Sequence, residues 1–253
     1  MPSQLIITHY SFITPVPNNY FQFKQFRINQ DLCAMKVCTD SCVFGAYVEV
    51  RQAKRILDIG TGTGLLALMV AQRSEAVVEA VEINPEAQVQ AAQNFTESPR
   101  AERLQLHPMP LQEFAKACTQ QYDVILSNPP FFLASLRSDN AAKNTAKHTG
   151  DLLFEDILTF AQKHLTPEGK LYLLLPPAEG NHFAELAKAH ALYLAETLEV
   201  YTRTAGKCIR HIQTYTFSPT KEVNSKKLNI REEDGTTYTA DFTALLRDYY
   251  LNF

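Results

Sequence analysis

Residues 122–132 of this 253-residue chain read Tyr-Asp-Val-Ile-Leu-Ser-Asn-Pro-Pro-Phe-Phe. The apolar run 124–126 is typical of a strand that is buried on both faces of a sheet. Neither Pro129 nor Pro130 has an N–H to donate to a strand ladder, so the strand ends at Asn128. In open α/β sheets, ligands bind beside the carboxyl ends of strands, which makes this turn a candidate functional site.

The turn after this strand carries groups suited to a planar amine. A residue before proline is pushed toward extended geometry, so the Asn128 amide projects beyond the strand. The Asn128 side-chain oxygen and the Pro129 carbonyl are two acceptors for an exocyclic NH2, and Phe131 offers a ring face for stacking. The candidate catalytic residues are therefore Asn128, Pro129, Pro130 and Phe131. Asn-Pro-Pro alone is equally compatible with a loop tip in which the asparagine only caps the turn.

A second informative stretch spans residues 55–68. Its apolar residues predict a buried strand, which is followed by Gly60, Gly62 and Gly64 and then by a helix over residues 65–71. Glycine allows positive φ and a close approach of the backbone to a ligand, and the N–H groups at a helix start attract anions. Asp58 lies at the end of the strand. This pattern predicts a cofactor loop, although its G-x-G-x-G spacing differs from the dinucleotide pattern G-x-G-x-x-G.

The next strand, predicted over residues 77–81, ends in Glu82. An acid about twenty residues after a glycine loop is placed to accept hydrogen bonds from both hydroxyls of a ribose. Loop and acid together favour a cofactor that contains adenosine. S-adenosylmethionine is favoured over NAD because the dinucleotide pattern is missing and Asn-Pro-Pro-Phe follows.

The remaining segments predict a doubly wound α/β sheet. Further helices are expected over residues 85–95, 111–117, 152–164 and 182–192, and further strands over 104–106, 170–175, 196–201 and 211–217. Residues 20–28 alternate aromatic and polar side chains, which suggests a hairpin with residues 35–39. Thr39 or Asp40 is a plausible N-cap for a helix that continues through residues 43–48.

Composition places the chain among globular proteins, with 45% hydrophobic and 20% charged residues. No apolar run is long enough to span a membrane. Five cysteines and the lack of a secretory segment argue against a disulfide framework and indicate the cytoplasm. Cys33, Cys38 and Cys42 do not have the spacing of a zinc knuckle and lack an obvious fourth ligand, so no metal is expected.

Charge is distributed unevenly along the chain. The net charge of −3 argues against a protein that coats nucleic acid nonspecifically. Residues 201–231 nevertheless carry seven basic side chains and one acid, Glu222, and a local patch is enough for phosphate contacts. A solvated face explains the same pattern. The polar stretch 133–150, which includes Arg137 and His148, is interpreted as a substrate loop.

Five segments resemble the bacterial tRNA(Val) adenosine-37 N6-methyltransferase family. They are Phe23-Lys24-Gln25-Phe26, the run Cys-Ala-Met-Lys-Val-Cys-Thr-Asp at 33–40, the glycine loop within 57–68, Asn-Pro-Pro-Phe-Phe at 128–132, and Tyr249-Tyr250-Leu251. The glycine loop is common to class I methyltransferases, and Asn-Pro-Pro-Phe occurs in several branches that methylate planar amides or amines. The N-terminal block and the C-terminal tail are shared by far fewer families and are therefore more specific.

This resemblance implies a Rossmann-like class I methyltransferase with a seven-stranded, mostly parallel sheet, one reversed strand, and helices on both faces. Residues 1–50 would form an N-terminal extension packed on a methyltransferase domain of residues 51–253. The expected cofactor-binding residues are Lys36, Thr39, Asp40, Asp58, Gly60, Thr61, Gly62, Gly64, Glu82, Ile83, Leu111 and Asn128. The expected substrate-binding residues are Phe131, Lys147, Lys207, Arg210, Lys226 and Lys227. One departure is Pro110, where many relatives have an acid for the adenine amine of the cofactor; Gln112 or a backbone carbonyl is a possible substitute.

The function implied is S-adenosylmethionine-dependent methylation of N6 of adenosine 37 in the anticodon loop of a valine tRNA, with neither a membrane nor a metal as partner. Two alternatives use the same scaffold. One is an N-methyltransferase of ribosomal RNA or of protein glutamine, because Asn-Pro-Pro with an aromatic residue serves all these reactions. The other is a noncatalytic RNA-binding module, which the intact glycine loop and Asn128 disfavour.

Overall fold

The computed structural model describes residues 18–33, 35–130 and 142–253, with the backbone alone for residues 142–152. Its main sheet has eight strands in the order β10-β8-β9-β7-β6-β3-β4-β5, and β9 alone runs against the others. The strands are β3 (Arg55–Ile59), β4 (Val77–Val81), β5 (Leu104–His107), β6 (Tyr122–Ser127), β7 (Leu165–Leu175), β8 (Tyr193–Arg203), β9 (Cys208–Thr216) and β10 (Asn224–Arg231). The α/β class with one reversed strand is confirmed.

The prediction of seven strands was wrong by one. The additional strand is β10, which pairs in parallel with β8 at the edge of the sheet. Only Leu228 and Ile230 of this strand are buried, and its first four residues are exposed. An edge strand with one solvent-exposed face has few apolar residues, so its sequence cannot be distinguished from that of a polar linker.

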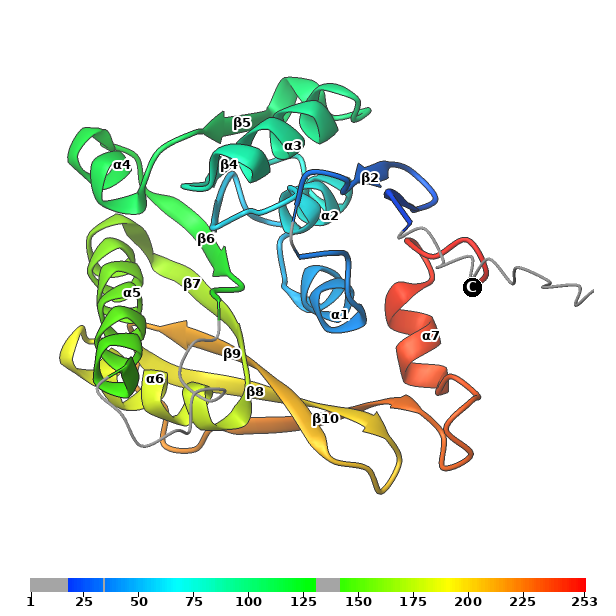
Figure 1. Cartoon of the computed structure of the whole chain (residues 1–253). Coiled ribbons are helices and arrows are strands. Elements are labelled where there is room, and N and C mark those ends of the chain that lie inside the picture. The colour runs from blue at the N-terminus through cyan, green and yellow to red at the C-terminus, as the bar shows by residue number, and fades with distance from the viewer. Residues whose placement is uncertain (1–17, 34, 131–141) are drawn as a thin grey trace, which may run out of the picture.

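Helices cover both faces of the sheet, as predicted (Figure 1). One face is packed against α1 (Thr39–Tyr47), α2 (Leu65–Arg73), α3 (Pro85–Thr96) and α7 (Ala240–Leu246), and the other against α4 (Leu111–Ala117), α5 (Ala142–His164) and α6 (Pro177–Ala189). A short 3-10 helix, η1 (Ala101–Arg103), precedes β5. Two layers of helices on a largely parallel sheet leave only its strand ends accessible to a ligand.

Two predicted helix starts were wrong. The helix expected to begin at residue 152 begins at Ala142, so part of the predicted substrate loop is helical. Residues 142–151 contain good helix formers such as alanine and lysine but few apolar residues, which hid the helical period. The helix expected at residue 182 begins at Pro177, because a proline is well accommodated in the first turn of a helix.

The N-terminal hairpin uses a nearer partner than predicted. Strand β1 (Tyr20–Gln22) pairs with β2 (Arg27–Asn29), not with residues 35–39, and the chain reverses through a turn in which the Phe23 N–H donates to the Phe26 carbonyl at 2.9 Å. Helix α1 already includes Thr39, so its N-cap is Cys38 rather than Thr39 or Asp40.

The C-terminal tail holds this hairpin against the main body. The Lys24 N–H donates to the Tyr249 carbonyl at 2.8 Å, and the Lys24 ammonium donates to the Arg247 carbonyl at 2.6 Å. The Tyr249 ring is 1% exposed, and its hydroxyl donates to the Met69 carbonyl of α2 at 2.8 Å. The tail therefore joins the N-terminal hairpin to α2, although the three segments lie far apart in the sequence. Helix α1 packs against α2 and α7 beside them.

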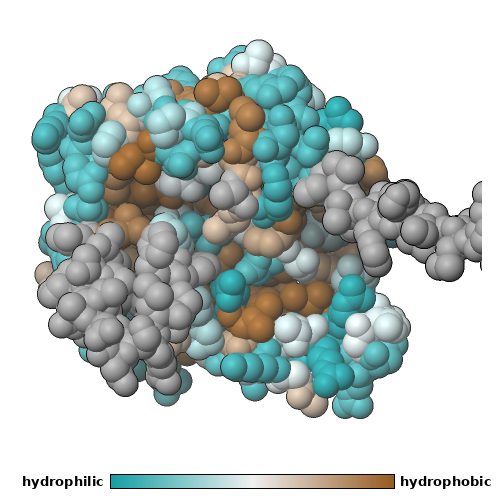
Figure 2. Space-filling model, in the orientation of Figure 1, coloured by the Kyte–Doolittle hydropathy of each residue, from teal (hydrophilic) through white to brown (hydrophobic). Residues whose placement is uncertain are grey.

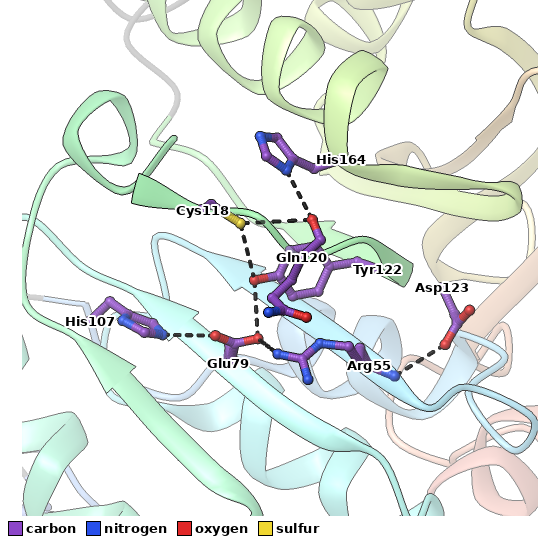
Figure 3. A network of polar contacts seen from close by, with 8 residues as sticks. All are labelled: Arg55, Glu79, His107, Cys118, Gln120, Tyr122, Asp123 and His164. Carbon is purple, nitrogen blue, oxygen red and sulfur yellow. Dashed lines mark hydrogen bonds and ion pairs between the residues drawn. The ribbon is translucent and has the colours of Figure 1, made fainter. Parts of the chain in front are cut away.

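A buried polar network links β6 to the three strands beyond it in the sheet, β3, β4 and β5 (Figure 3). The Glu79 carboxylate of β4 accepts hydrogen bonds from Arg55 of β3 at 2.6 Å and from the Tyr122 hydroxyl of β6 at 3.0 Å, and it lies 3.0 Å from the His107 ring of β5. Burial, together with the charge of Glu79, raises the pKa of Tyr122 far above its usual value, so the phenol stays a donor. This network fixes the relative positions of the strands whose carboxyl ends form the site described below.

The tail predicts a measurable contribution to stability. Tyr249→Ala is expected to lower the free energy of unfolding by about 3–5 kcal/mol, the range for removing a large buried aromatic side chain. Leu251→Ala is a matched control two residues away, since Leu251 is 58% exposed, and should change stability by at most about 0.5 kcal/mol. Urea denaturation of both variants checks this expectation, and equal midpoints for the two would contradict the anchoring role of Tyr249.

Candidate active site

The glycine loop between β3 and α2 leaves open space in front of its backbone. Gly60 and Gly62 have φ of +73° and +58°, and a Cβ added to either would meet nothing within 4 Å. Gly64 has φ of +84°, and a Cβ there would lie 2.5 Å from the Phe95 ring. Gly60 and Gly62 thus form a cradle for a ligand, whereas Gly64 permits the close packing of α2 and α3.

A buried acid lies beneath this cradle at the end of β3. Asp58 is fully buried, and its Oδ2 accepts a hydrogen bond from the Thr61 hydroxyl at 2.6 Å. Its Oδ1 is buried without a hydrogen-bond partner among the residues that the structure describes. Burial, with a smaller effect of the Glu82 charge, raises the pKa of Asp58 to about 7. An unpartnered buried carboxylate oxygen calls for a ligand with a donor or a positive charge.

A second acid, Glu82, follows β4 and is held in place by backbone N–H groups. Its Oε2 accepts from the Gly62 N–H and its Oε1 from the Asn84 N–H, both at 2.8 Å. Each carboxylate oxygen keeps a further lone pair for a hydroxyl donor. The neighbouring Ile83 is 66% exposed, which places a bare apolar side chain beside the acid.

The Asn128 amide stands at the end of β6. Its Nδ2 donates to the Ser41 hydroxyl of α1 at 3.1 Å. Its Oδ1 is buried and has no hydrogen-bond partner in the described part of the chain. Pro129 is buried and Pro130 exposed. Phe131 lies outside the described residues, and so does the side chain of Lys147.

The first turn of α1 brings an N-terminal segment to this edge of the sheet. Asp40 forms an ion pair with Arg210 of β9 at 2.8 Å, while Thr39 is exposed. Lys36 donates to the Gln30 carbonyl and so supports the segment that leads into α1. Ser41 was not predicted, although its position directly after Thr39-Asp40 in the N-terminal block was a signal.

At the adenine end of the predicted cofactor site, position 110 before α4 holds a proline instead of an acid. Pro110 is the N-cap of this helix, and Leu111 is buried. The Gln112 amide donates to Asp156 of α5 at 2.5 Å. Gln112 is therefore engaged with a neighbouring helix and is a poor substitute for the missing acid.

The predicted basic residues do not form one continuous surface, because some are engaged in ion pairs and others point to opposite faces of a strand. Lys207 is exposed in the turn between β8 and β9, and Arg210 is paired with Asp40. Lys226 is paired with Glu196 at 2.7 Å, whereas the Lys227 ammonium lies 5.6 Å from the centre of the Tyr201 ring. Successive residues of a strand point to opposite faces, so Lys226 and Lys227 cannot meet the same ligand surface.

The strand ends enclose a surface of mixed character. Figure 2 shows apolar side chains gathered in a depression between the part of the molecule that carries α3 and α4 and the part that carries β8 and β10, both of which have polar rims. In the described ranges, no three His, Cys, Asp or Glu side chains lie close enough to hold a metal ion, and the five cysteines are unbridged. None of the helices described is long and apolar enough to cross a membrane.

The geometry fits the predicted cofactor. S-adenosylmethionine carries two ribose hydroxyls, an apolar adenine face, and a methionine portion with two positive groups, the ammonium and the sulfonium, and one carboxylate. The groups of the protein that suit these features are the anchored Glu82 carboxylate, the exposed Ile83 side chain, and the Asp58 oxygen that lacks a partner in the described part of the chain, below an open glycine cradle. A dinucleotide pyrophosphate would instead meet the buried Asp58 carboxyl group at this loop.

Comparison with known proteins agrees with this description. A family model described as "Methyltransferase small domain" matches residues 33–190. The solved structure of a predicted O-methyltransferase, Atu636 from Agrobacterium tumefaciens, has the same fold, with a TM-score of 0.64, 18% identity, and coverage of 83% of this chain and 96% of that one.

Curated relatives match over almost their whole length. The proteins from Dyadobacter fermentans and Cytophaga hutchinsonii are 44% and 45% identical to this chain, each over 93% of it and 99% of the relative. The protein from Yersinia enterocolitica is 38% identical over 92% of this chain and 93% of its own length. All three are named tRNA1(Val) (adenine(37)-N6)-methyltransferase. The chain therefore belongs to the tRNA1(Val) (adenine(37)-N6)-methyltransferase family, whose members are S-adenosylmethionine-dependent enzymes.

Proposed function

We propose that this protein transfers a methyl group from S-adenosylmethionine to the exocyclic N6 of adenosine 37 in the anticodon loop of a valine tRNA. The observation that carries the proposal is the buried Oδ1 of Asn128, which has no hydrogen-bond partner among the described residues and stands at the end of β6 beside the glycine cradle at the end of β3. The names of relatives that share 38–45% of their sequence with this chain supply the base and its position.

The cofactor, when bound, supplies an electrophilic methyl group on a sulfonium. Glu82 would hold the ribose hydroxyls, and Ile83 and Leu111 would cover the adenine ring. Gly60, Thr61 and Gly62 would lie against the amino-acid portion, with the Asp58 carboxylate below them. Gly64 serves the packing of the loop rather than contact, because its missing Cβ faces Phe95.

Asn128 acts on the target amine. The lone pair of an adenine amine is delocalised into the ring, so the nitrogen is a weak nucleophile. The Asn128 Oδ1 and the Pro129 carbonyl would accept hydrogen bonds from the two N–H groups of the amine. These contacts would steer the nitrogen toward tetrahedral geometry. They would also stabilise the positive charge that develops on it, and a preorganised dipole at such a position has a large effect on rate. The proton then leaves an already cationic product, so no strong base is needed before transfer.

The RNA must present the base outside its stack. A base in a folded loop is turned out to enter an enzyme pocket, and an aromatic side chain such as Phe131 would replace the lost stacking. Lys207 and Lys227 are the basic residues best placed for phosphate contacts, since Arg210 and Lys226 are engaged in ion pairs. Lys147 remains a candidate on α5. A tRNA substrate also favours a cytoplasmic location.

The N-terminal extension takes part in this site. We propose that residues 1–50 extend a methyltransferase domain of residues 51–253. Helix α1 belongs to the extension, yet its Ser41 contacts Asn128 and its Asp40 contacts Arg210. Thr39 precedes Asp40 in the same helical turn, and Lys36 supports the segment that leads into α1, so we assign Lys36, Thr39 and Asp40 to the cofactor side of the site.

The role of Asn128 gives the most direct kinetic prediction. Asn128→Ala is expected to lower the single-turnover rate of methyl transfer to a valine tRNA by roughly a hundredfold or more, because one oriented acceptor is lost. Binding of S-adenosylmethionine should be nearly unchanged. Transfer at close to the wild-type rate would remove Asn128 from the chemistry.

The ribose contact predicts an affinity loss. Glu82→Ala should weaken S-adenosylmethionine binding by about 1–3 kcal/mol, the range for removing a charged hydrogen-bond partner. Glu75→Ala is a suitable control because the Glu75 side chain is 97% exposed. If calorimetry gives the same affinity for both variants, Glu82 does not hold the cofactor.

The buried Asp58 predicts a pH dependence of binding. With a pKa of about 7, this carboxyl group is mostly neutral below neutral pH and anionic above it, and only the anion attracts a positively charged ligand. The affinity for S-adenosylmethionine should therefore rise between about pH 6 and pH 7.5, with release of a proton on binding. Calorimetry in buffers of different ionisation enthalpy measures both effects. Asp58→Asn should abolish them, and the same pH profile in this variant would assign the titration to another group.

The basic surface predicts a change in salt dependence. Replacing Lys207 and Lys227 by alanine should weaken RNA binding and reduce the slope of log K against log salt by about 0.7–0.9 for each phosphate that the protein no longer neutralises. Lys188→Ala is the control, since Lys188 pairs with Glu185 on α6 at 2.8 Å. An unchanged slope in the double variant would mean that neither lysine contacts a phosphate and that both are simply solvent-exposed.

A further inference from the structure

The orientation of the Asn128 amide decides whether the proposed site attracts or repels an amine. With Oδ1 toward the site, the side chain accepts a hydrogen bond from an N–H group. After a half turn of the amide, Nδ2 would face the site, and two donors would oppose each other. The chemistry of the site therefore depends on whatever distinguishes the two ends of this amide.

Ser41 contacts the end of the Asn128 amide that faces away from the proposed site. Its hydroxyl oxygen lies 3.1 Å from the Asn128 Nδ2, and the serine is 5% exposed. A hydroxyl is able to accept from Nδ2 or to donate to Oδ1, so this contact alone does not choose the orientation. The choice depends on where the hydroxyl proton of Ser41 goes.

Cys38 offers a place for that proton. Its Sγ lies 3.0 Å from the Ser41 hydroxyl oxygen. Burial and then the Asp40 carboxylate raise the pKa of the Cys38 thiol, so the thiol stays protonated. A hydrogen bond with Asp40 is among the causes of this shift, and a carboxylate only accepts, so the S–H is directed to Asp40 and the sulfur lone pairs are left for the Ser41 hydroxyl 3.0 Å away. The lone pairs of Ser41 then face Asn128.

Asp40 is itself fixed from the opposite side. It forms the 2.8 Å ion pair with Arg210 of β9, and its Oδ1 also accepts from the Ser41 N–H at 3.0 Å. Donors therefore follow one another in a single direction, from Cys38 to Asp40, from Ser41 to Cys38, and from Asn128 to Ser41. Such a directional arrangement of hydrogen bonds ends in one acceptor, the Asn128 Oδ1, that has no partner within residues 18–33, 35–130 and 153–253.

We propose that Ser41 is a positioning residue that holds the Asn128 amide with its oxygen toward the target amine. This inference rests on the proposed role of Asn128. It gives the N-terminal extension a function in the transfer step itself, because the first turn of α1 would determine the direction of the acceptor at the end of β6.

A double-mutant cycle tests the inference. Ser41→Ala should lower the single-turnover rate at saturating cofactor and RNA by about tenfold or more, the effect expected when a buried donor loses its partner and the amide turns freely. Cofactor affinity and the thermal midpoint should stay close to wild type. In an Asn128→Ala background, Ser41→Ala should change the rate by less than about twofold, because the group that Ser41 orients is gone.

The controls separate the possible failures. Ser74→Ala removes another buried hydroxyl, which donates to the Val70 carbonyl at 3.0 Å, and should leave the rate unchanged. Ser41→Thr keeps the hydroxyl and should retain most of the rate. An equal rate loss from Ser41→Ala in both backgrounds would show that Ser41 does not act through Asn128 and would overturn the inference. A wild-type rate in Asn128→Ala alone would instead overturn the proposed function.

A spectroscopic measurement gives an answer that does not depend on turnover. The side-chain amide signal of Asn128 in a nitrogen–proton correlation spectrum is identified by its absence in Asn128→Ala. In Ser41→Ala this signal should shift and its protons should exchange faster with solvent. An unchanged signal would mean that Ser41 does not hold the amide, and this would overturn the inference whatever the rates are.

Discussion

The end of β6 is the constraint on which the site depends. The last residue of this strand, Ser127, still pairs with β3, and its hydroxyl donates to the Ile59 carbonyl at 2.8 Å. The ladder cannot continue through Pro129 and Pro130, so Asn128 is the first side chain beyond the sheet. Since β3 lies between β4 and β6, the glycine loop, Glu82 and Asn128 come to lie along one edge. In the proposed site, this strand order places the cofactor next to the target amine.

The second contribution comes from chain segments at the two ends of the sequence. The hairpin and the C-terminal tail hold each other through Lys24 and Tyr249, and α1 packs against α2 and α7 next to them. This packing delivers Ser41 and Asp40 to the ends of β6 and β9. In the proposed site, the methyltransferase core supplies the cofactor loop and the acceptor, and we infer that the N-terminal extension holds that acceptor in place.

Local sequence patterns predicted the parts of the site that a single segment creates. The glycine loop, Glu82 at the end of β4 and Asn128 before two prolines each follow from a few consecutive residues, and the structure has them where the patterns indicated. Contacts between distant segments left no such pattern. Ser41 reaches Asn128 across the fold, and Arg210 is engaged by Asp40, although the sequence shows it only as one basic residue among seven. Strand β10 and the start of α5 were missed because their sequences contain few apolar residues, so the apolar period is weak.

We propose that this protein makes N6-methyladenosine at position 37 of a valine tRNA, with Asn128 as the acceptor for the amine. The most direct measurement is mass spectrometry of nucleosides and mapped fragments from valine tRNA of a strain that lacks the gene, complemented with either the wild-type protein or Asn128→Ala. We expect N6-methyladenosine at position 37 to disappear in the deletion, to return with the wild-type protein and not to return with the variant. Persistence of the modification in the deletion strain, or its full return with Asn128→Ala, would contradict it.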